Sequence, residues 1–208
     1  MEATDLPASK EWTTIARWLI IGTLGYNIVE AVVALWSGWA AHSNALVGFG
    51  LDSVIESAAA GVMLWRLSVE ARGASPDAIE RAEARVRKFV GATFFGLVAY
   101  VGVKSVLTLI RQEAPSESWV GIGLAIASLI IMPVIALYKM KAADRIGSRA
   151  LRSEARETLA CSYLSLTLLL GLSLHAFSES LWWADPGAAL LMVPWLIREG
   201  FEGFETES

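Results

Sequence analysis

The sequence contains few of the residues that carry covalent catalysis, with one cysteine and two histidines among 208 residues. A single cysteine excludes a disulfide within the chain. No histidine lies within a helical turn of Cys161 to activate its thiol, and no oxyanion-hole signature is visible. These absences disfavour a membrane enzyme with Cys161 as its nucleophile, and we expect that the protein is not an enzyme and uses no cofactor.

Charge is also scarce. Charged residues make up 18% of the sequence and hydrophobic residues 55%, and the net charge is −4. This net charge gives no reason to expect nucleic acid as a partner. A soluble domain of this size would need far more polar surface than the composition provides. The composition therefore points to the lipid bilayer as the surroundings of this chain.

Long apolar segments fill the sequence instead. A transmembrane helix needs roughly 17–25 predominantly apolar residues. Six segments come close to or reach this length, at about residues 15–36, 43–65, 89–110, 119–138, 154–175 and 183–197. The sequence predicts an all-α membrane protein with six transmembrane helices, in a single transmembrane domain over residues 1–208. Only Glu199–Ser208 follow the last helix, so we expect no soluble C-terminal domain.

Lysine and arginine residues gather after the second and fourth predicted helices. The first group is Arg66, Arg72, Arg81, Arg85, Arg87 and Lys88, and the second is Lys139, Lys141, Arg145, Arg149, Arg152 and Arg156. The positive-inside rule places these loops and both termini in the cytoplasm. The nine tryptophans fall near predicted helix ends, where indole rings favour the headgroup level. We expect a multi-pass protein of the cell (inner) membrane.

One polar pattern occurs twice, with an offset of 105 residues. Ser43-x-Ala45-Leu46 is matched by Ser148-x-Ala150-Leu151, and the pair Asp52 and Glu56 is matched by Glu157 and Cys161. In the predicted topology the second helix runs inward and the fifth runs outward. The sequence therefore predicts an inverted repeat of helices 1–3 and 4–6, an arrangement typical of transporters with an ion site between their halves.

Asp52 and Glu56 form the first pair, four residues apart on one helix face and close to mid-bilayer. An ionised carboxylate that is buried without a partner is very unfavourable. Protons, a cation or a basic group must therefore compensate for the two acids. A pair of protonated acids, bonded to backbone or hydroxyl groups, is the structural alternative, although acids within the membrane are usually functional.

Glu157 and Cys161 form the second pair. Together with Asp52 and Glu56 they supply three carboxylates and a thiolate, a four-ligand set that tetrahedral zinc accepts. The thiolate favours zinc or cadmium over magnesium or calcium. Alone, Cys161 would more often be a small apolar packing residue, but its place in the repeat favours a ligand role.

Three further polar residues are possible auxiliary groups. Glu154 lies three residues before Glu157 on the same face, on the path by which a cation would arrive from the cytoplasm. Asn27 and Glu30 lie in the first helix. Glu30 could support the ligands, carry a proton, or pair with Lys104, which could instead snorkel toward the outer interface.

These motifs resemble the cation diffusion facilitator family of metal exporters, specifically its short forms. The resemblance covers about residues 15 to 198 and rests on Asn27, Gly38, Ser43-x-Ala45-Leu46, Asp52-Ser53-x-x-Glu56, Glu157-x-x-x-Cys161 and Trp183-Ala184-Asp185-Pro186. It implies six helices, cytoplasmic termini, a homodimer and divalent-metal export in exchange for protons. It also implies a transport site built from the paired residues of helices 2 and 5.

The sequence departs from the family pattern at three ligand positions. Glu56 stands where a second aspartate is common, Glu157 where histidine is usual, and Cys161 where aspartate is usual. Metal chemistry stays plausible, and the selectivity is left open. The cytoplasmic metal-binding domain that usually follows helix 6 is also missing from the pattern.

Our hypothesis from the sequence is proton-coupled export of a divalent metal, with zinc, or cadmium, held by Asp52, Glu56, Glu157 and Cys161. The metal and protons would be substrates, and no cofactor is implied. The alternative is a metal-binding membrane sensor or scaffold that does not transport. Binding of metal without a counter-flux of protons would favour that alternative.

Overall fold

The computed structural model describes residues 6–70, 75–113, 116–147, 149–202 and residue 204. Its six α-helices are α1 (Leu6–Ala41), α2 (Asn44–Glu70), α3 (Pro76–Arg111), α4 (Trp119–Ile146), α5 (Arg149–Phe177) and α6 (Ala184–Glu202). A short 3-10 helix, η1 (Glu179–Leu181), precedes α6. The described ranges contain no strand, so the all-α prediction is confirmed.

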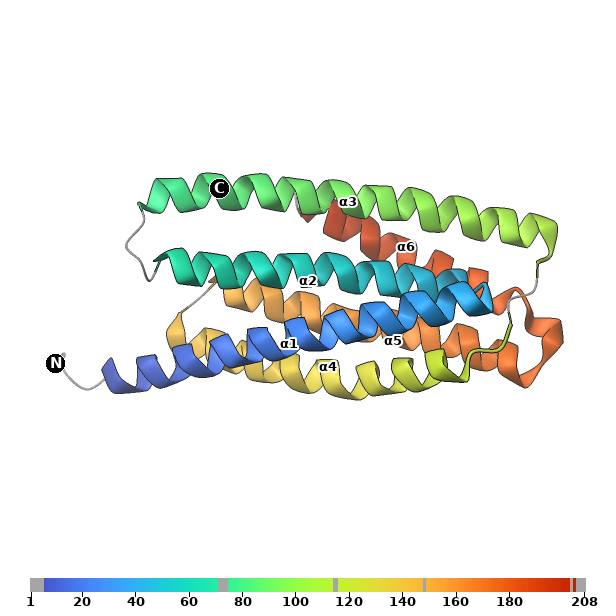
Figure 1. The fold of residues 1–208 in the computed structure, drawn as a ribbon, viewed down its shortest axis with the longest axis horizontal. Coiled ribbons are helices and arrows are strands. Elements are labelled where there is room, and N and C mark those ends of the chain that lie inside the picture. Colours follow the sequence, from blue (N-terminus) through green and yellow to red (C-terminus); the bar gives the residue numbers. More distant parts are fainter. Residues whose placement is uncertain (1–5, 71–74, 114–115, 148, 203, 205–208) are drawn as a thin grey trace.

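The helices form an up-and-down bundle, in which each helix runs antiparallel to the one before it (Figure 1). α1 begins and α6 ends toward the same end of the bundle, which we call the terminal end; the other is the distal end. Five helices, α1 to α5, contain stretches long and apolar enough to span a membrane by length and composition. α6 is shorter, at 19 residues, and packs along α3.

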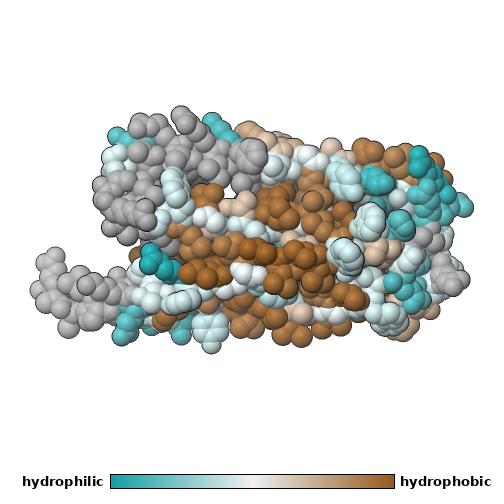
Figure 2. Space-filling view, viewed as in Figure 1, coloured by the Kyte–Doolittle hydropathy of each residue, from teal (hydrophilic) through white to brown (hydrophobic). Residues whose placement is uncertain are grey.

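The surface matches this arrangement. Figure 2 shows hydrophobic side chains in a broad band across the middle of one face, with hydrophilic side chains toward both ends of the bundle. Several large apolar side chains point outward, among them Trp18, Trp36 and Trp119, each at least two-thirds exposed. An exposed apolar band of this kind is expected of a surface that faces lipid.

The helix neighbours are consistent with the inverted repeat. α1 packs on α2 as α4 packs on α5, and α2 packs on α3 as α5 packs on α6. The equivalent helices of the two halves also contact one another: α1 with α4, α2 with α5, and α3 with α6. Contacts between equivalent elements are expected where a pseudo-twofold axis passes between two halves.

The predicted helices are all present, and at the terminal end of the bundle each of the six extends beyond its predicted bounds. α1 begins at Leu6 rather than 15, and α6 ends at Glu202 rather than 197. α2 ends at Glu70 rather than 65, α3 begins at Pro76 rather than 89, α4 ends at Ile146 rather than 138, and α5 begins at Arg149 rather than 154. The extra turns are polar, so the apolar lengths gave no sign of them. α4 stops where Gly147 takes the left-handed conformation (φ 68°), which glycine adopts without strain.

Two apolar cores lie one above the other within the bundle. The distal core includes Phe49 of α2 and Leu164 of α5. The terminal core includes Ala60 of α2 and Leu151 of α5. The polar segments 52–56 and 157–161 therefore lie between two apolar layers.

Candidate metal site

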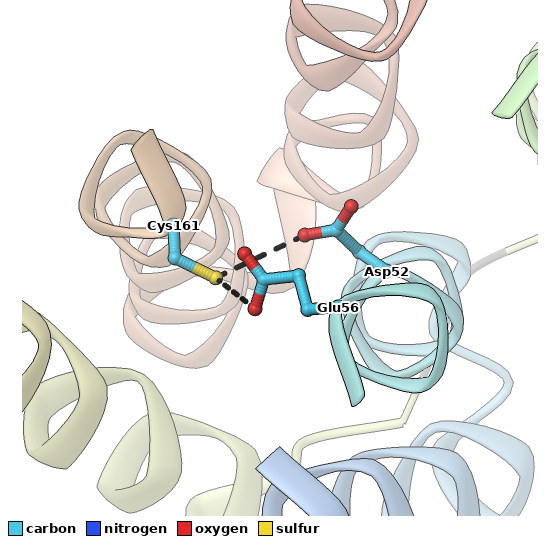
Figure 3. A group of neighbouring side chains, drawn as sticks. All are labelled: Asp52, Glu56 and Cys161. Carbon is cyan, nitrogen blue, oxygen red and sulfur yellow. Dashed lines mark hydrogen bonds between the residues drawn. The ribbon is translucent and has the colours of Figure 1, made fainter. Parts of the chain in front are cut away.

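Asp52 and Glu56 of α2 and Cys161 of α5 form a compact group of three side chains (Figure 3). The Cys161 Sγ lies 3.1 Å from Glu56 Oε2 and 3.9 Å from Asp52 Oδ2. One ligand atom from each residue lies within 4.8 Å of the other two. Asp52 and Cys161 are 3% and 1% exposed, so water reaches these two side chains very little.

The geometry follows from the helix spacing and is consistent with the predicted repeat. Asp52 and Glu56 share a face of α2 because residues four apart lie one turn from each other. Glu56 and Cys161 occupy equivalent positions of the two halves, 105 residues apart, and the thiol contacts the carboxylate directly. Equivalent residues meet in this way when they lie beside the axis that relates two halves.

The spacing of the donor atoms suits a small tetrahedral cation. With ordinary zinc bond lengths and the tetrahedral angle, a sulfur and an oxygen on one zinc ion lie about 3.6 Å apart. The two measured separations, 3.1 and 3.9 Å, lie on either side of this value. Two carboxylate groups and one thiolate leave a fourth coordination position for water or for another ligand.

Two residues of α1 border this group. Asn27 donates from Nδ2 to Glu56 Oε2 over 3.0 Å, and Glu30 accepts at Oε2 from the Ser53 hydroxyl over 2.8 Å. Asn27 and Glu30 are 2% and 1% exposed. A hydrogen bond to a ligand carboxylate fixes its orientation, and Asn27 is placed to do this for Glu56.

Glu157 does not join the three-residue group among the described residues. It lies four residues before Cys161, so it sits about 6 Å nearer the terminal end along α5. Its charged neighbours there are Glu199, Glu154 and Lys139. The structure thus brings together three of the four predicted ligands and places Glu157 one turn of α5 closer to the terminal end.

Glu154 lies a further turn toward the terminal end and is engaged by a lysine. Lys139 Nζ lies 3.0 Å from Glu154 Oε1 and donates to Thr158 Oγ1 over 3.1 Å. Lys139 is 0% exposed. The sequence predicted it in the loop after the fourth helix, which is wrong, because α4 continues past it to Ile146 and turns it toward α5.

Glu199 of α6 is a residue that the sequence analysis missed. It is 9% exposed and lies within electrostatic range of both Asp52 and Glu157. Its position could have been found from spacing, because Ala189, Met192, Leu196 and Glu199 recur at the intervals of one helix face. The other three are buried, so this pattern turns Glu199 inward.

The repeated serine motif and the acidic-proline step meet at the distal end. Ser43 caps α2, since its Oγ accepts from the Leu46 backbone N–H over 3.1 Å. Asp185, at the start of α6, accepts from the Ser43 hydroxyl and from the Asn44 backbone N–H. The carboxylate of one helix thereby fixes the start of the helix that carries Asp52 and Glu56. The matching Ser148 lies outside the described residues.

Lys104 does not pair with Glu30, because the structure places it at the distal end of α3. It is exposed there and lines a cavity of about 400 Å³ together with His42, Asn44 and Glu113. The snorkelling alternative therefore describes Lys104, and the Glu30 carboxyl interacts with Ser53 instead.

Comparison with known proteins agrees with these features. Residues 20–205 match the family model described as the cation efflux transmembrane domain. Transmembrane protein 163 of Xenopus laevis is 20% identical over 182 residues, which cover 85% of this chain and 62% of that protein. The chain thus spans less than two thirds of the length of this relative.

The family match includes Asp52, Glu56 and Cys161 and all six helices apart from the first turns of α1. It extends over most of the chain, so it does not depend on one motif. The description of this family is one of cation transport across a membrane. The chain belongs to the cation efflux transmembrane domain family and is an integral, multi-pass membrane protein.

Proposed function

We propose that this chain exports a divalent metal from the cytoplasm, with zinc as the preferred ion, and that Asp52, Glu56 and Cys161 hold the ion during transport. The observation that carries this proposal is the convergence of the three donors from two antiparallel helices, at separations that suit tetrahedral zinc. One thiolate among the donors favours zinc or cadmium over magnesium and calcium.

Proton coupling follows from the chemistry of these ligands. Carboxylates and a thiolate bind a metal only when they are deprotonated, so protons and zinc compete for the same atoms. High cytoplasmic pH would favour binding, and low pH on the other side would favour release. Two carboxylates and a thiolate that exchange a divalent ion for protons change little in charge, which suits a site between apolar layers.

The acids below the site outline the path of the ion. With the terminal end in the cytoplasm, Glu157 and Glu199 lie between the cytoplasm and the three ligands. Their carboxylates would attract a cation toward Asp52, and Glu157 would hold it about one helical turn before the three ligands. Rocking of one half of the inverted repeat against the other would then expose the ion to the opposite side.

We also propose that the protein is a homodimer of the cell (inner) membrane with both termini in the cytoplasm. The orientation follows from the lysine and arginine bias, and the dimer follows from the family resemblance. Cross-linking in native membranes and accessibility of terminal tags test these two points.

Zinc flux into proteoliposomes is the direct test. The purified protein is reconstituted, a zinc-sensitive dye is enclosed, and zinc is added outside with and without a pH gradient. We expect flux that rises with the gradient and is lost in Asp52→Ala. Glu113→Gln is the matched control, because it neutralises an acid that is 60% exposed at the distal end. Zinc binding without any flux would instead indicate a sensor or scaffold.

A further inference from the structure

A second group of buried polar atoms lies beside the metal site, around Glu30 of α1. Its carboxyl is 1% exposed, and only Oε2 has a hydrogen-bond partner, the Ser53 hydroxyl. Oε1 makes no hydrogen bond with any described residue. A buried carboxylate oxygen without a partner is rare in proteins and calls for an explanation.

Two hydroxyl groups share this condition. Tyr26, one turn before Glu30 on α1, and Ser128 of α4 both lie beside the Glu30 carboxyl. Neither hydroxyl reaches hydrogen-bonding geometry with a partner among the described residues, and Ser128 is 0% exposed. Three buried oxygen atoms from two helices thus face one small region, each with unused capacity to hold a ligand.

The donor set differs in kind from the metal site. It contains only oxygen atoms, which suit hard cations and not soft ones. It carries one carboxylate and two neutral hydroxyls, so it balances one positive charge, whereas Asp52, Glu56 and Cys161 balance two or more. Among the described residues, Glu30 makes no ion pair, so its carboxyl is balanced either by a proton or by a cation from outside the chain.

We propose that Tyr26, Glu30 and Ser128 form a separate site for the counter-cation of transport, a monovalent ion that is either Na⁺ or a hydrated proton. Both ions take several oxygen donors. The proposal rests on the transport function proposed above, and it adds a second site for the exchanged ion beside the ligands at which protons compete with zinc.

The two sites are joined by short links. Ser53, which donates to Glu30, directly follows Asp52 on α2. Asn27, three residues before Glu30 on α1, donates to Glu56. Any displacement of α1 against α2 therefore alters both sites together, which is the structural requirement for coupling two bound ions.

The charges around Glu30 agree with a cation there. The titratable groups that face it are Tyr26 on its own helix, Asp52 and Glu56 on α2 and Cys161 on α5, while α4 contributes the neutral Ser128. All four carry either negative charge or none. A monovalent cation would thus be attracted, and its departure would favour zinc at the neighbouring acids.

The test measures zinc flux in proteoliposomes under two separate gradients. One arm applies a Na⁺ gradient at equal pH, and the other applies a pH gradient with Na⁺ replaced by a large organic cation. We expect one gradient to accelerate flux, which identifies the ion, and Glu30→Gln to remove that acceleration. Zinc affinity of the same variant, measured by calorimetry, should stay within about threefold of the unsubstituted protein, since no zinc ligand is lost.

Tyr26→Phe and Ser128→Ala are milder variants, because each takes away a hydroxyl and leaves the rest of the side chain. Each removes one oxygen, so half-maximal acceleration should need about tenfold more of the counter-cation. Acceleration that survives Glu30→Gln unchanged overturns this proposal and leaves zinc transport standing, as does loss of zinc affinity together with flux. Absence of zinc flux in the unsubstituted protein under either gradient overturns the transport function itself.

Discussion

Two of the places where the bundle encloses acidic side chains lie close together beside α5, and the acids there have different partners. At the first, between α4 and α5, Glu154 is met by Lys139 at 3.0 Å, and Thr158 accepts a second hydrogen bond from the lysine. At the second, between α2 and α5, the Cys161 thiol contacts both Asp52 and Glu56, and the Asn27 amide donates a hydrogen bond to Glu56. No basic side chain forms an ion pair with these two acids in the described ranges.

The difference separates a structural element from a site that needs an ion. The Lys139–Glu154 pair balances its own charge and fixes α4 against α5. The α2 acids and Cys161 balance charge only with protons or with a bound cation. The two places lie within two helical turns of each other on α5. The ion pair at Glu154 therefore holds α5 against α4, while Cys161, farther along the helix, is left to bind an ion.

The largest expected effect is on zinc affinity, from substitution of an acid that has no lysine partner. Asp52→Ala removes a ligand carboxylate, and we expect zinc affinity to fall by about 100-fold or more, since even the supporting partners of metal ligands contribute about 10–100-fold. Titration calorimetry of purified protein measures this, with Glu113→Gln as the acid variant that should bind like the unsubstituted protein. Unchanged affinity in Asp52→Ala would remove this residue from the site.

Breaking the Lys139–Glu154 pair should lower stability and leave zinc affinity unchanged. Lys139→Met leaves the Glu154 carboxyl partly buried without its partner, and we expect a loss of about 3 kcal/mol in unfolding free energy, at the low end for broken buried pairs because Glu154 is 12% exposed. Thermal unfolding in detergent gives the measurement.

The double variant Lys139→Met with Glu154→Leu supplies the control, because replacing both partners with apolar residues is often close to neutral. Zinc affinity should remain unchanged in the folded Lys139→Met protein. A large loss of zinc affinity with stability intact would show that the two places are not separate in function.

Asn27 sharpens the comparison, because it is the polar group that Glu56 has in place of a lysine. Asn27→Leu removes the hydrogen bond to Glu56 Oε2, and we expect zinc affinity to fall by about tenfold to 100-fold. Asn27→Asp is the informative second variant, since it adds a charge without restoring a donor to an ionised Glu56. If Asn27→Leu bound zinc normally, the amide would serve packing alone.

Cys161 should affect selectivity more than affinity. Cys161→Ser exchanges a soft donor for a hard one of similar size, and we expect the ratio of cadmium to manganese affinity to fall by about tenfold. Competition titrations with the two metals measure this ratio. An unchanged ratio would mean that the sulfur is a packing group and not a ligand.

Much of this arrangement could be predicted from particular residues. The apolar lengths predicted the helices, and the four-residue spacing predicted that Asp52 and Glu56 share a face. The 105-residue repeat predicted a ligand role for Cys161, although a lone cysteine in an apolar helix usually packs. The distance of 3.1 Å between Cys161 Sγ and Glu56 Oε2 agrees with this prediction.

Other features depended on quantities that the sequence does not carry. Glu157 is separated from Asp52, Glu56 and Cys161 because of the position of α5 along the axis of α2. Only the packing of the whole bundle determines that position. Lys139 was misplaced because polar turns extend α4 beyond its apolar stretch. Glu199 was missed although its spacing fits one face of α6, because the last predicted helix ended at 197 and left Glu199 outside it.

X-ray absorption spectroscopy of the zinc-bound protein tests the central claim most directly, because it counts the atoms around the metal. With Asp52, Glu56 and Cys161 as ligands, we predict one sulfur at about 2.3 Å and oxygen atoms at about 2.0–2.2 Å, with the sulfur shell lost in Cys161→Ser. A spectrum of stoichiometrically bound zinc that contains oxygen or nitrogen alone would contradict the proposed site.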